Sequence, residues 1–592
     1  GKQDGGALGK SDSGHDGTAH MLIEEANSLK IEEVDTAVID RVFSSSAKLS
    51  DEAIVDFVTH LCAISREEIQ ANPSNPRVFS MQKVVEITYF NMSRIRIVWS
   101  RIWSILGEHF QSVALVSNIE LSMYAIDSMR QLALKFLEKD ELTSFHFQRD
   151  FLKPFDFAMG NSKSADIREL VIRCLTQVVL STARNIKSGW KVAFQVLNTA
   201  GRDTAETIVT LAFDLVRKVV YESFEQLIED PAHGSAAYVD CINCLTTFAS
   251  NDKFTAISVE AVDLINTCTR ITIKGLARHA AEEAVADLNG AAEARLQSGG
   301  GQYQFTESEP HVRLWFPVLT GLNRISVDPR LDIRSRALDS LFEVLQTYGE
   351  MFSPGLWDLV FHGVLFPLFD DIRHVDEEQG ETEWIRTSCG PAMHKLSELF
   401  ARFFASLSGL LPEMFRLLGQ CIAHQNEAVA HIGVGSIKAL LAEKAAVLTD
   451  AMWDSLCEVV SSVFEQASPL SDSALSEEMA HVGMDDRLRV VGTRHRVRML
   501  LLKLVQDLCT DHSKSLGQGQ MTKLLNLLGK AHNNALGCSL ERSTGRGLEG
   551  LGQVGAGQYL QWIYAESAEA SRSELTFMLH VFHREQEALL KG

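Results

Sequence analysis

Residues 315–345 read WFPVLTGLNRISVDPRLDIRSRALDSLFEVL, and this stretch shows the pattern that decides the fold. An apolar segment opens on Trp315, and a second apolar segment surrounds the small residue Ala337. Apolar residues spaced three and four apart indicate amphipathic helices. The Asp-x-Arg sequences between the segments are typical of repeat turns, where an Asp caps a helix and an Arg pairs with an Asp of the neighbouring repeat. The stretch therefore predicts one pair of helices.

The same pattern recurs along the chain at intervals of roughly 40–50 residues, or about twice that. Small residues followed by apolar positions occur at Ala125, Cys174, Ala212, Ala261, Ala337 and Ser436. The partner helices are predicted to open on aromatic residues at Trp190, Trp315, Trp357 and Trp453. A two-helix unit of this length is the signature of a HEAT/armadillo-like solenoid, so we predict an all-α fold of stacked helix pairs.

Composition shifts divide the predicted array. The expected parts are a disordered tail (1–20), a first part of the solenoid (21–280), an acidic, Gly-rich linker (281–310), a second part of the solenoid (311–465), and a divergent C-terminal helical region (466–592) with a Gly-rich loop (539–558). In the first part we expect a helix over 51–69 with Ile54, Phe57, Val58, Leu61 and Ile64 on one face. A long helix is predicted from about Val78 to Phe110, with a core stripe of Ile95, Val98, Trp99, Ile102, Trp103 and Leu106.

The composition limits the possible functions. The 592 residues contain 56 Lys and Arg against 77 Asp and Glu, a net charge of −21, which argues against a protein that coats nucleic acid. Only 12 residues are proline, which suits long helices. No apolar run is long enough to span a bilayer, and no signal peptide is recognised. The ten scattered cysteines are expected to be free core residues of a cytoplasmic protein. Because the chain starts at Gly1, we expect a piece of a longer protein.

Motifs for chemistry are weak. Gly9-Lys10-Ser11 resembles the end of a phosphate-binding loop but lacks its first glycine, and Gly550–Gly555 matches GxGxxG without a preceding strand. Cys241 and Cys244 form a lone CxxC pair, which is expected to pack in a helical core because zinc would need four ligands. The sequence therefore predicts no enzyme activity, no cofactor and no metal site.

One basic segment stands out in this acidic chain. Residues 77–103 carry five basic residues, with Glu86 the single acidic residue, and the candidate docking residues are Lys83, Arg94, Arg96 and Arg101. We expected Arg94 and Arg101, seven residues apart, to share one helix face. Two interpretations are open. The residues either pair with acidic groups inside the chain or form a docking surface for an acidic partner or an anionic membrane.

The same segment also carries a resemblance to a known family. RVFSMQKVVEITYFNMSRIRIVWSRIW (77–103) is similar to the region just downstream of the catalytic domain in the large, brefeldin A-inhibited, Golgi-type exchange factors for ARF GTPases. Further similar segments are 127–142, 147–155, 167–174, 187–190, 315–322, 328–345 and 364–374, with plant or algal members the most alike. The resemblance is strongest over 77–190, looser over about 40–465, and thin from 466 onward.

The resemblance implies a regulatory and partner-binding role. In that family, exchange belongs to a separate upstream domain with an invariant glutamate after a motif like FRLPGEAQ, and no such motif occurs here. The resemblance therefore implies a non-catalytic region that takes part in autoinhibition, GTPase sensing and peripheral recruitment to trans-Golgi or endosomal membranes. Expected partners are ARF or Rab-type GTPases, upstream domains of the same protein and, for self-association, a second copy.

A second hypothesis from a different class is an unrelated transport scaffold or adaptor, like the karyopherins. Acidic HEAT arrays suit basic cargo, and the net charge of −21 fits that use. No karyopherin-like motif supports it, and capture of nuclear-transport cargo would favour it.

Overall fold

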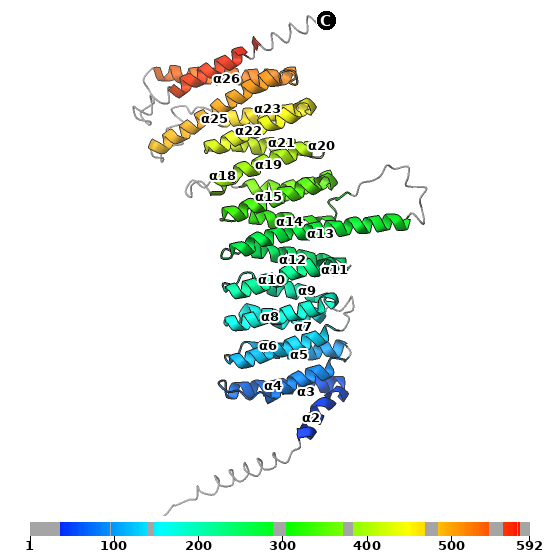
Figure 1. The fold of residues 1–592 in the computed structure, drawn as a ribbon. Coiled ribbons are helices and arrows are strands. Elements are labelled where there is room, and N and C mark those ends of the chain that lie inside the picture. The colour runs from blue at the N-terminus through cyan, green and yellow to red at the C-terminus, as the bar shows by residue number, and fades with distance from the viewer. Residues whose placement is uncertain are drawn as a thin grey trace, which may run out of the picture. The chain divides into compact units, whose positions relative to one another are not determined.

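A computed structural model describes residues 36–94, 96–138, 147–230, 232–287, 304–370, 383–467, 484–543, 561–576 and 578–579. It divides into two compact units, Gly1–Phe248 and Ala249–Gly592. Each unit is a stack of helices, as predicted for an all-α solenoid (Figure 1). Within the described ranges the extended structure amounts to one isolated bridge between Phe305 and Phe352.

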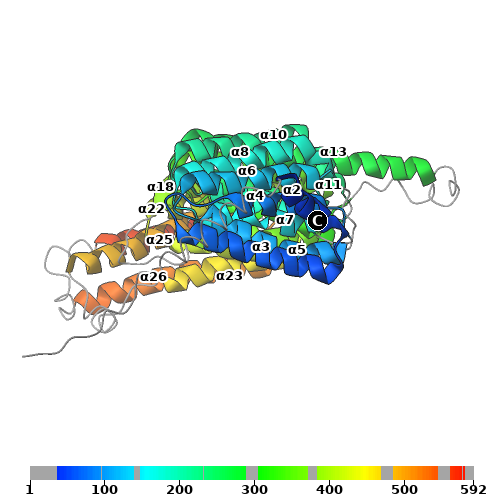
Figure 2. The same ribbon diagram turned by 90° about the horizontal axis from the view of Figure 1, so that it is seen from below.

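The helices of the first unit form two layers. They are α2 (Thr36–Ser44), α3 (Asp51–Ala71), α4 (Phe79–Asn91), α5 (Arg96–Ala114), α6 (Ile119–Phe136), α7 (Phe147–Asn161), α8 (Ala165–Thr182), α9 (Gly189–Ala200), α10 (Glu206–Glu222), α11 (Phe224–Glu229) and α12 (Gly234–Ala249). Helices α4, α6, α8 and α10 contact one another in succession, and so do α3, α5, α7 and α9. Figure 2 looks along this stack and separates α6, α8 and α10 from α3 and α5.

The second unit repeats the arrangement with longer and less regular helices. They are α13 (Thr255–Asp287), α14 (Glu309–Ile325), α15 (Leu331–Tyr348), α16 (Pro354–Val360), α18 (Glu383–Thr387), α19 (Cys389–Arg402), α20 (Phe404–Leu407), α21 (Leu411–Ala423), α22 (Glu427–Lys444), α23 (Asp450–Gln466), α25 (Met484–Asp511), α26 (Gln518–Ser543) and a helix over 561–576. Helices α13, α15, α19, α22 and α25 follow one another in one layer.

The predicted small residues lie in the core of the stack. Ala125, Cys174, Ala212, Ala261, Ala337 and Ser436 are all buried, on α6, α8, α10, α13, α15 and α22 respectively. A small side chain lets adjacent helices of a layer approach closely, and the flanking branched residues fill the remaining space. This burial confirms the repeat pattern that the sequence indicates.

Three helix boundaries differ from the prediction. The single helix expected over 78–110 is wrong, because α4 ends at Asn91 and α5 begins at Arg96. Helix α14 begins at Glu309 with Pro310 in its first turn, so Trp315 lies inside the helix instead of opening it. Helix α13 continues to Asp287, so the first residues of the expected 281–310 linker are helical.

Two side-chain predictions also need correction. Ile64 was expected on the buried face of α3 but is 49% exposed, whereas Ile54, Val58 and Leu61 are buried. The Asp of Asp-x-Arg was expected to cap helices, but the N-cap of α15 is Arg330, and Asp332 lies in its first turn. The same holds for the Asp166-Ile-Arg168 sequence of α8, where Ser164 is the N-cap. The predicted tail (1–20) and residues 544–558 of the predicted Gly-rich loop lie outside the described residues.

Candidate docking surfaces

Lys83 lies inside the first unit instead of on its surface. Its side chain on α4 is 7% exposed, and Nζ lies 2.7 Å from Asp40 Oδ1 and 2.9 Å from Glu86 Oε2. The ammonium group also lies 5.2 Å from the centre of the Phe43 ring, within cation–π range. Burial lowers the pKa of Lys83, but the hydrogen bonds to Asp40 and Glu86 outweigh it and raise the pKa above its ordinary value. The ammonium therefore stays charged and fastens α2 to α4.

Arg94 holds the turn between α4 and α5. Its side chain is 12% exposed, and Nη2 donates to the carbonyl oxygens of Ser46, Ala47 and Leu49 at 3.0, 3.2 and 2.6 Å. Nε donates to Asn91 Oδ1 at 2.7 Å, and Nη1 lies 3.2 Å from Asp51 Oδ1. The guanidinium thus binds three carbonyl oxygens around the end of the short 3-10 helix Ser45–Lys48, an interaction that suits its fixed fork of donors.

The four basic candidates do not form one patch. Lys83 and Arg94 have partners inside the chain, as the interpretation of internal pairing proposes. Arg101 is exposed on α5, and the side chain of Arg96 lies outside the described residues. Because Arg94 precedes α5, it does not share a helix face with Arg101. Docking of a partner by Arg101 stays a prediction.

Exposed apolar side chains cluster in sequence around the same turn. Tyr89 and Phe90 end α4, with ring centroids 6.1 Å apart, and Ile97 opens α5 with most of its surface in solvent. These residues could not be recognised from the sequence, because its apolar periodicity predicts one continuous helix there. The break between Asn91 and Arg96 was the missing signal.

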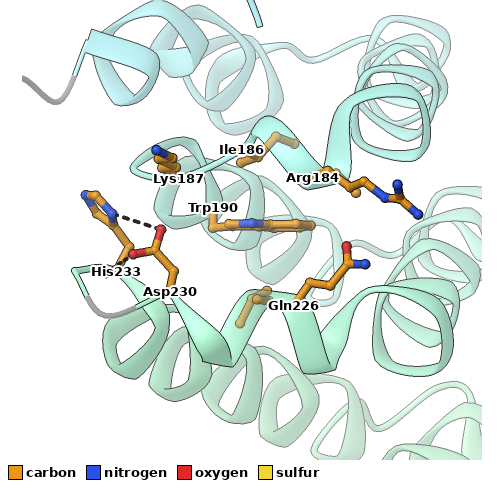
Figure 3. A pocket seen from close by; sticks show the side chains of 9 residues that line it. Arg184, Ile186, Lys187, Trp190, Gln226, Asp230 and His233 are labelled. Atoms are coloured by element: carbon orange, nitrogen blue, oxygen red, sulfur yellow. Dashed lines mark hydrogen bonds and ion pairs between the residues drawn. The ribbon is translucent and has the colours of Figure 1, made fainter. Parts of the chain in front are cut away.

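A small pocket lies between two turns of the first unit (Figure 3). Its volume is about 90 Å³. The lining residues come from the α8–α9 connection, the start of α9, helix α11 and the α11–α12 connection: Ala183, Arg184, Ile186, Lys187, Trp190, Gln226, Leu227, Asp230 and His233. The indole of Trp190 lies across the pocket between Lys187 and Gln226.

Asp230 is the acidic residue of this pocket, and its carboxylate accepts hydrogen bonds from the backbone of its own turn. Its Oδ1 accepts from the backbone N–H groups of Ala232 at 2.8 Å and His233 at 3.1 Å, and its Oδ2 lies 3.3 Å from His233 Nδ1. Burial raises the pKa of Asp230, but these backbone donors and His233 outweigh it and lower the pKa. The carboxylate therefore caps the turn before α12, and it is not poised for proton transfer.

The cysteines pack as core residues. All nine cysteines whose side chains are described are buried, including Cys241 and Cys244 of the CxxC pair. Burial raises the pKa of Cys174 to about 11 and that of Cys62 to about 12, so these thiols are not nucleophiles at neutral pH. Within the described ranges no cluster of His, Cys, Asp and Glu could hold a metal ion. The glycine motifs at 9–11 and 550–555 lie outside those ranges.

None of the helices that the structure describes is both long and apolar enough to cross a membrane.

Comparison with known proteins places the chain among exchange proteins. Residues 135–218 match the family model described as "Mon2/Sec7/BIG1-like, HDS", and residues 315–466 match that of the "GBF1-like, tetratrico peptide repeat region". The chain is 36% identical over 465 residues to brefeldin A-inhibited guanine nucleotide-exchange protein 2 of Arabidopsis thaliana, covering 74% of this chain and 26% of that protein. It is 37% identical over 432 residues to protein 1 of Homo sapiens, covering 73% and 22%.

The chain thus spans about a quarter of the length of these relatives. Among solved structures it is similar to importin beta, with 12% sequence identity and a TM-score of 0.23, over 97% of this chain and 75% of that one.

Proposed function

The chain belongs to the family of brefeldin A-inhibited guanine nucleotide-exchange proteins, and we propose that it is a non-catalytic regulatory part of such a protein. The observation that carries the proposal is the match of residues 135–218 to the HDS model within a chain 36% identical to these relatives. The proposed role is to bind partners that control an exchange domain elsewhere in the whole protein.

The partner we propose is an ARF GTPase in its GTP-bound form, on the cytoplasmic surface of Golgi membranes. A stack of helix pairs supports this role because it presents a long row of helix ends and turns to a second protein. The exposed residues Tyr89, Phe90 and Ile97, with Arg101 on α5, combine aromatic, aliphatic and cationic groups. Such a mixture is typical of protein docking sites. Binding there would also couple membrane recruitment to regulation of the exchange domain.

Sedimentation with vesicles tests this proposal. Vesicles that carry GTP-loaded ARF should retain the chain, and Arg101→Glu should weaken retention about tenfold by removing a favourable charge and adding a repulsive one. A matched control is Arg416→Glu on α21 of the second unit, which also reverses an exposed arginine. Unchanged retention of the Arg101→Glu chain would remove α5 from the docking surface. Failure of the parent chain to bind would contradict the proposal itself.

A further inference from the structure

The helix over 561–576 is attached to the second unit by an unusually polar face. Its buried residues are Ile563, Glu566, Ala570 and Ser573, and only Ile563 among them is a large apolar side chain. Helices elsewhere in the array bury a continuous apolar stripe, as α10 does with Ile208, Val209, Phe213, Leu215, Val216, Val219 and Val220. Hydrophobic burial therefore contributes much less to holding this helix than to holding α10.

A buried ion pair lies at the centre of that face. Arg498 of α25 donates from Nε to Glu566 Oε1, and the two side chains are 1% and 3% exposed. The guanidinium carbon lies 4.2 Å from the centre of the Phe464 ring of α23. His495, one turn before Arg498, stacks on Trp562 at 5.6 Å and has Nδ1 3.7 Å from Glu566 Oε2. Glu566 thus fits between two basic side chains of α25.

The remaining polar contacts join the helix to α26 and to the end of α25. His532 Nδ1 of α26 lies 2.8 Å from Ser571 Oγ and 3.3 Å from Ser567 Oγ. Ser573 Oγ donates to Gln506 Oε1 at 3.4 Å. Neutral hydrogen bonds of this kind exchange readily with bonds to water, so each contributes little to docking.

The buried charge of Arg498 depends on the Glu566 carboxylate for its compensation. Nη2 of Arg498 forms an ion pair with Glu566 Oε1, and Nη1 has no hydrogen-bond partner within the described part of the chain, so Glu566 supplies the main compensation of the guanidinium charge. Removing one partner of a buried ion pair leaves an uncompensated charge, whereas replacing both partners by apolar residues is often neutral or stabilising. Without the Glu566 carboxylate, the favourable outcome is for the helix to leave and for water to reach Arg498.

We propose that residues 561–576 form a releasable helix that Glu566 holds against α25 and α26, and we call the surface that it covers on these two helices the groove. The groove recognises a helix with small residues and one carboxylate, and its occupant is this chain's own segment. Release of the helix exposes Arg498, so the groove becomes a receptor for the same segment supplied from outside. This inference does not depend on the proposed function, since it uses only contacts within the second unit.

Hydrogen exchange of the full chain tests the release. Amides of 561–576 should exchange at least about tenfold faster in Glu566→Gln than in the parent chain, with α10 unchanged. The double variant Arg498→Met/Glu566→Leu should return exchange to the parent rate or below it. A matched control is Glu569→Gln, which removes a carboxylate of the same helix that pairs only with Arg572 among described residues. Equal exchange in the parent and in Glu566→Gln would overturn the proposal.

A labelled peptide of residues 561–576 provides a second and independent readout. It should bind the Glu566→Gln chain, whose groove is vacated, at least about tenfold more tightly than the parent chain. The same peptide with Gln at the Glu566 position should not bind. Binding of the Glu peptide shows that the variant keeps a folded groove. Equal binding of the Glu and Gln peptides would show that the carboxylate is not the key and would contradict the proposal.

Discussion

At the scale of single residues, the basic side chains of residues 77–103 illustrate how one pattern serves two uses. Lys83 and Arg94 connect elements within the first unit, while Arg101 faces solvent. Charge counting along the sequence detects all of them equally. Arg94 differs from Arg101 because it lies at the break before α5, close to the backbone carbonyl oxygens of Ser46 and Leu49. Charge counting contains neither of these facts.

Arg94→Ala should destabilise the chain by about 2–3 kcal/mol, because it leaves three backbone carbonyls without their charged donor. Arg94→Lys should recover only part of this loss, since an ammonium group cannot match the fork of the guanidinium. Urea unfolding of the three chains measures the difference. If Arg94→Ala unfolds at the same urea concentration as the parent, Arg94 does not hold the turn.

His109 makes the stability of the first unit sensitive to acid. The ring is buried on α5, with Nε2 3.1 Å from Ser65 Oγ, and burial followed by the charge of Arg66 lowers its pKa to about 4. The unfolded chain takes up a proton below the ordinary pKa of about 6.5, but the folded chain does not. The contribution of neutral His109 to the free energy of unfolding is therefore complete above about pH 6.5. It is lost as the pH falls toward 4, by about 3 kcal/mol at most.

The comparison with His109→Gln isolates this effect from that of other titrating groups. Glutamine can keep the bond to Ser65 but does not titrate. Between pH 7 and pH 4.5, the free energy of unfolding should fall by about 2 kcal/mol more in the parent than in the variant. Equal losses in both chains would show that His109 is not buried in its neutral form.

At the scale of helices, charged pairs connect successive repeats. Arg168 of α8 pairs with Asp203, in the α9–α10 connection, at 2.6 Å, and Arg336 of α15 pairs with Asp263 of α13 at 2.6 Å. The Arg168–Asp203 pair confirms the expectation that the Arg of Asp-x-Arg binds an Asp of a neighbouring repeat. The expectation was wrong for Arg330, which pairs with Asp328 of its own turn, and Arg336 is not part of an Asp-x-Arg sequence. The capping role expected of the Asp was wrong, because Ser164 precedes α8 and Asp166 is already helical.

The Arg168–Asp203 pair should show a coupling energy of about 1–3 kcal/mol in a double-mutant cycle of Arg168→Gln and Asp203→Asn. Both side chains are largely buried, and Asp203 also accepts the N–H of Ala205. The matched control on the same helix is the exposed pair Arg173–Glu169, whose coupling should be no more than about 0.5 kcal/mol. Equal couplings for the two pairs would contradict a structural role for Arg168.

Helix pairs and their buried small residues could be predicted because each depends on local periodicity, which the sequence contains. Ala125, Ala212 and Ala337 are examples, each on a helix that follows its predecessor in one layer. The turn at residues 92–95 could not be predicted, since no Pro or Gly marks it and Arg94 acts on carbonyls more than 40 residues away in sequence. Glu566 escaped prediction for the same reason, because its partner Arg498 lies on another helix.

At the scale of the whole molecule, the chain is a member of the exchange-protein family and is made of two units of stacked helices. The relatives are exchange proteins about four times as long as the matched region. The role proposed for this chain is therefore to bind partners that control an exchange domain elsewhere in the whole protein. A sensor of activated ARF must distinguish the two nucleotide states, because a ligand shifts an equilibrium only by its differential affinity. An exchange catalyst instead acts on the GDP-bound form, which its binding energy converts to the nucleotide-free form.

The most direct measurement is therefore the affinity of the chain for membrane-bound ARF loaded with GTP or with GDP, on otherwise identical vesicles. A regulatory docking region should bind the GTP form at least about tenfold more tightly, a difference of about 1.4 kcal/mol. Equal affinity for both forms, or tighter binding of the GDP form, would contradict the claim that this chain recognises activated ARF.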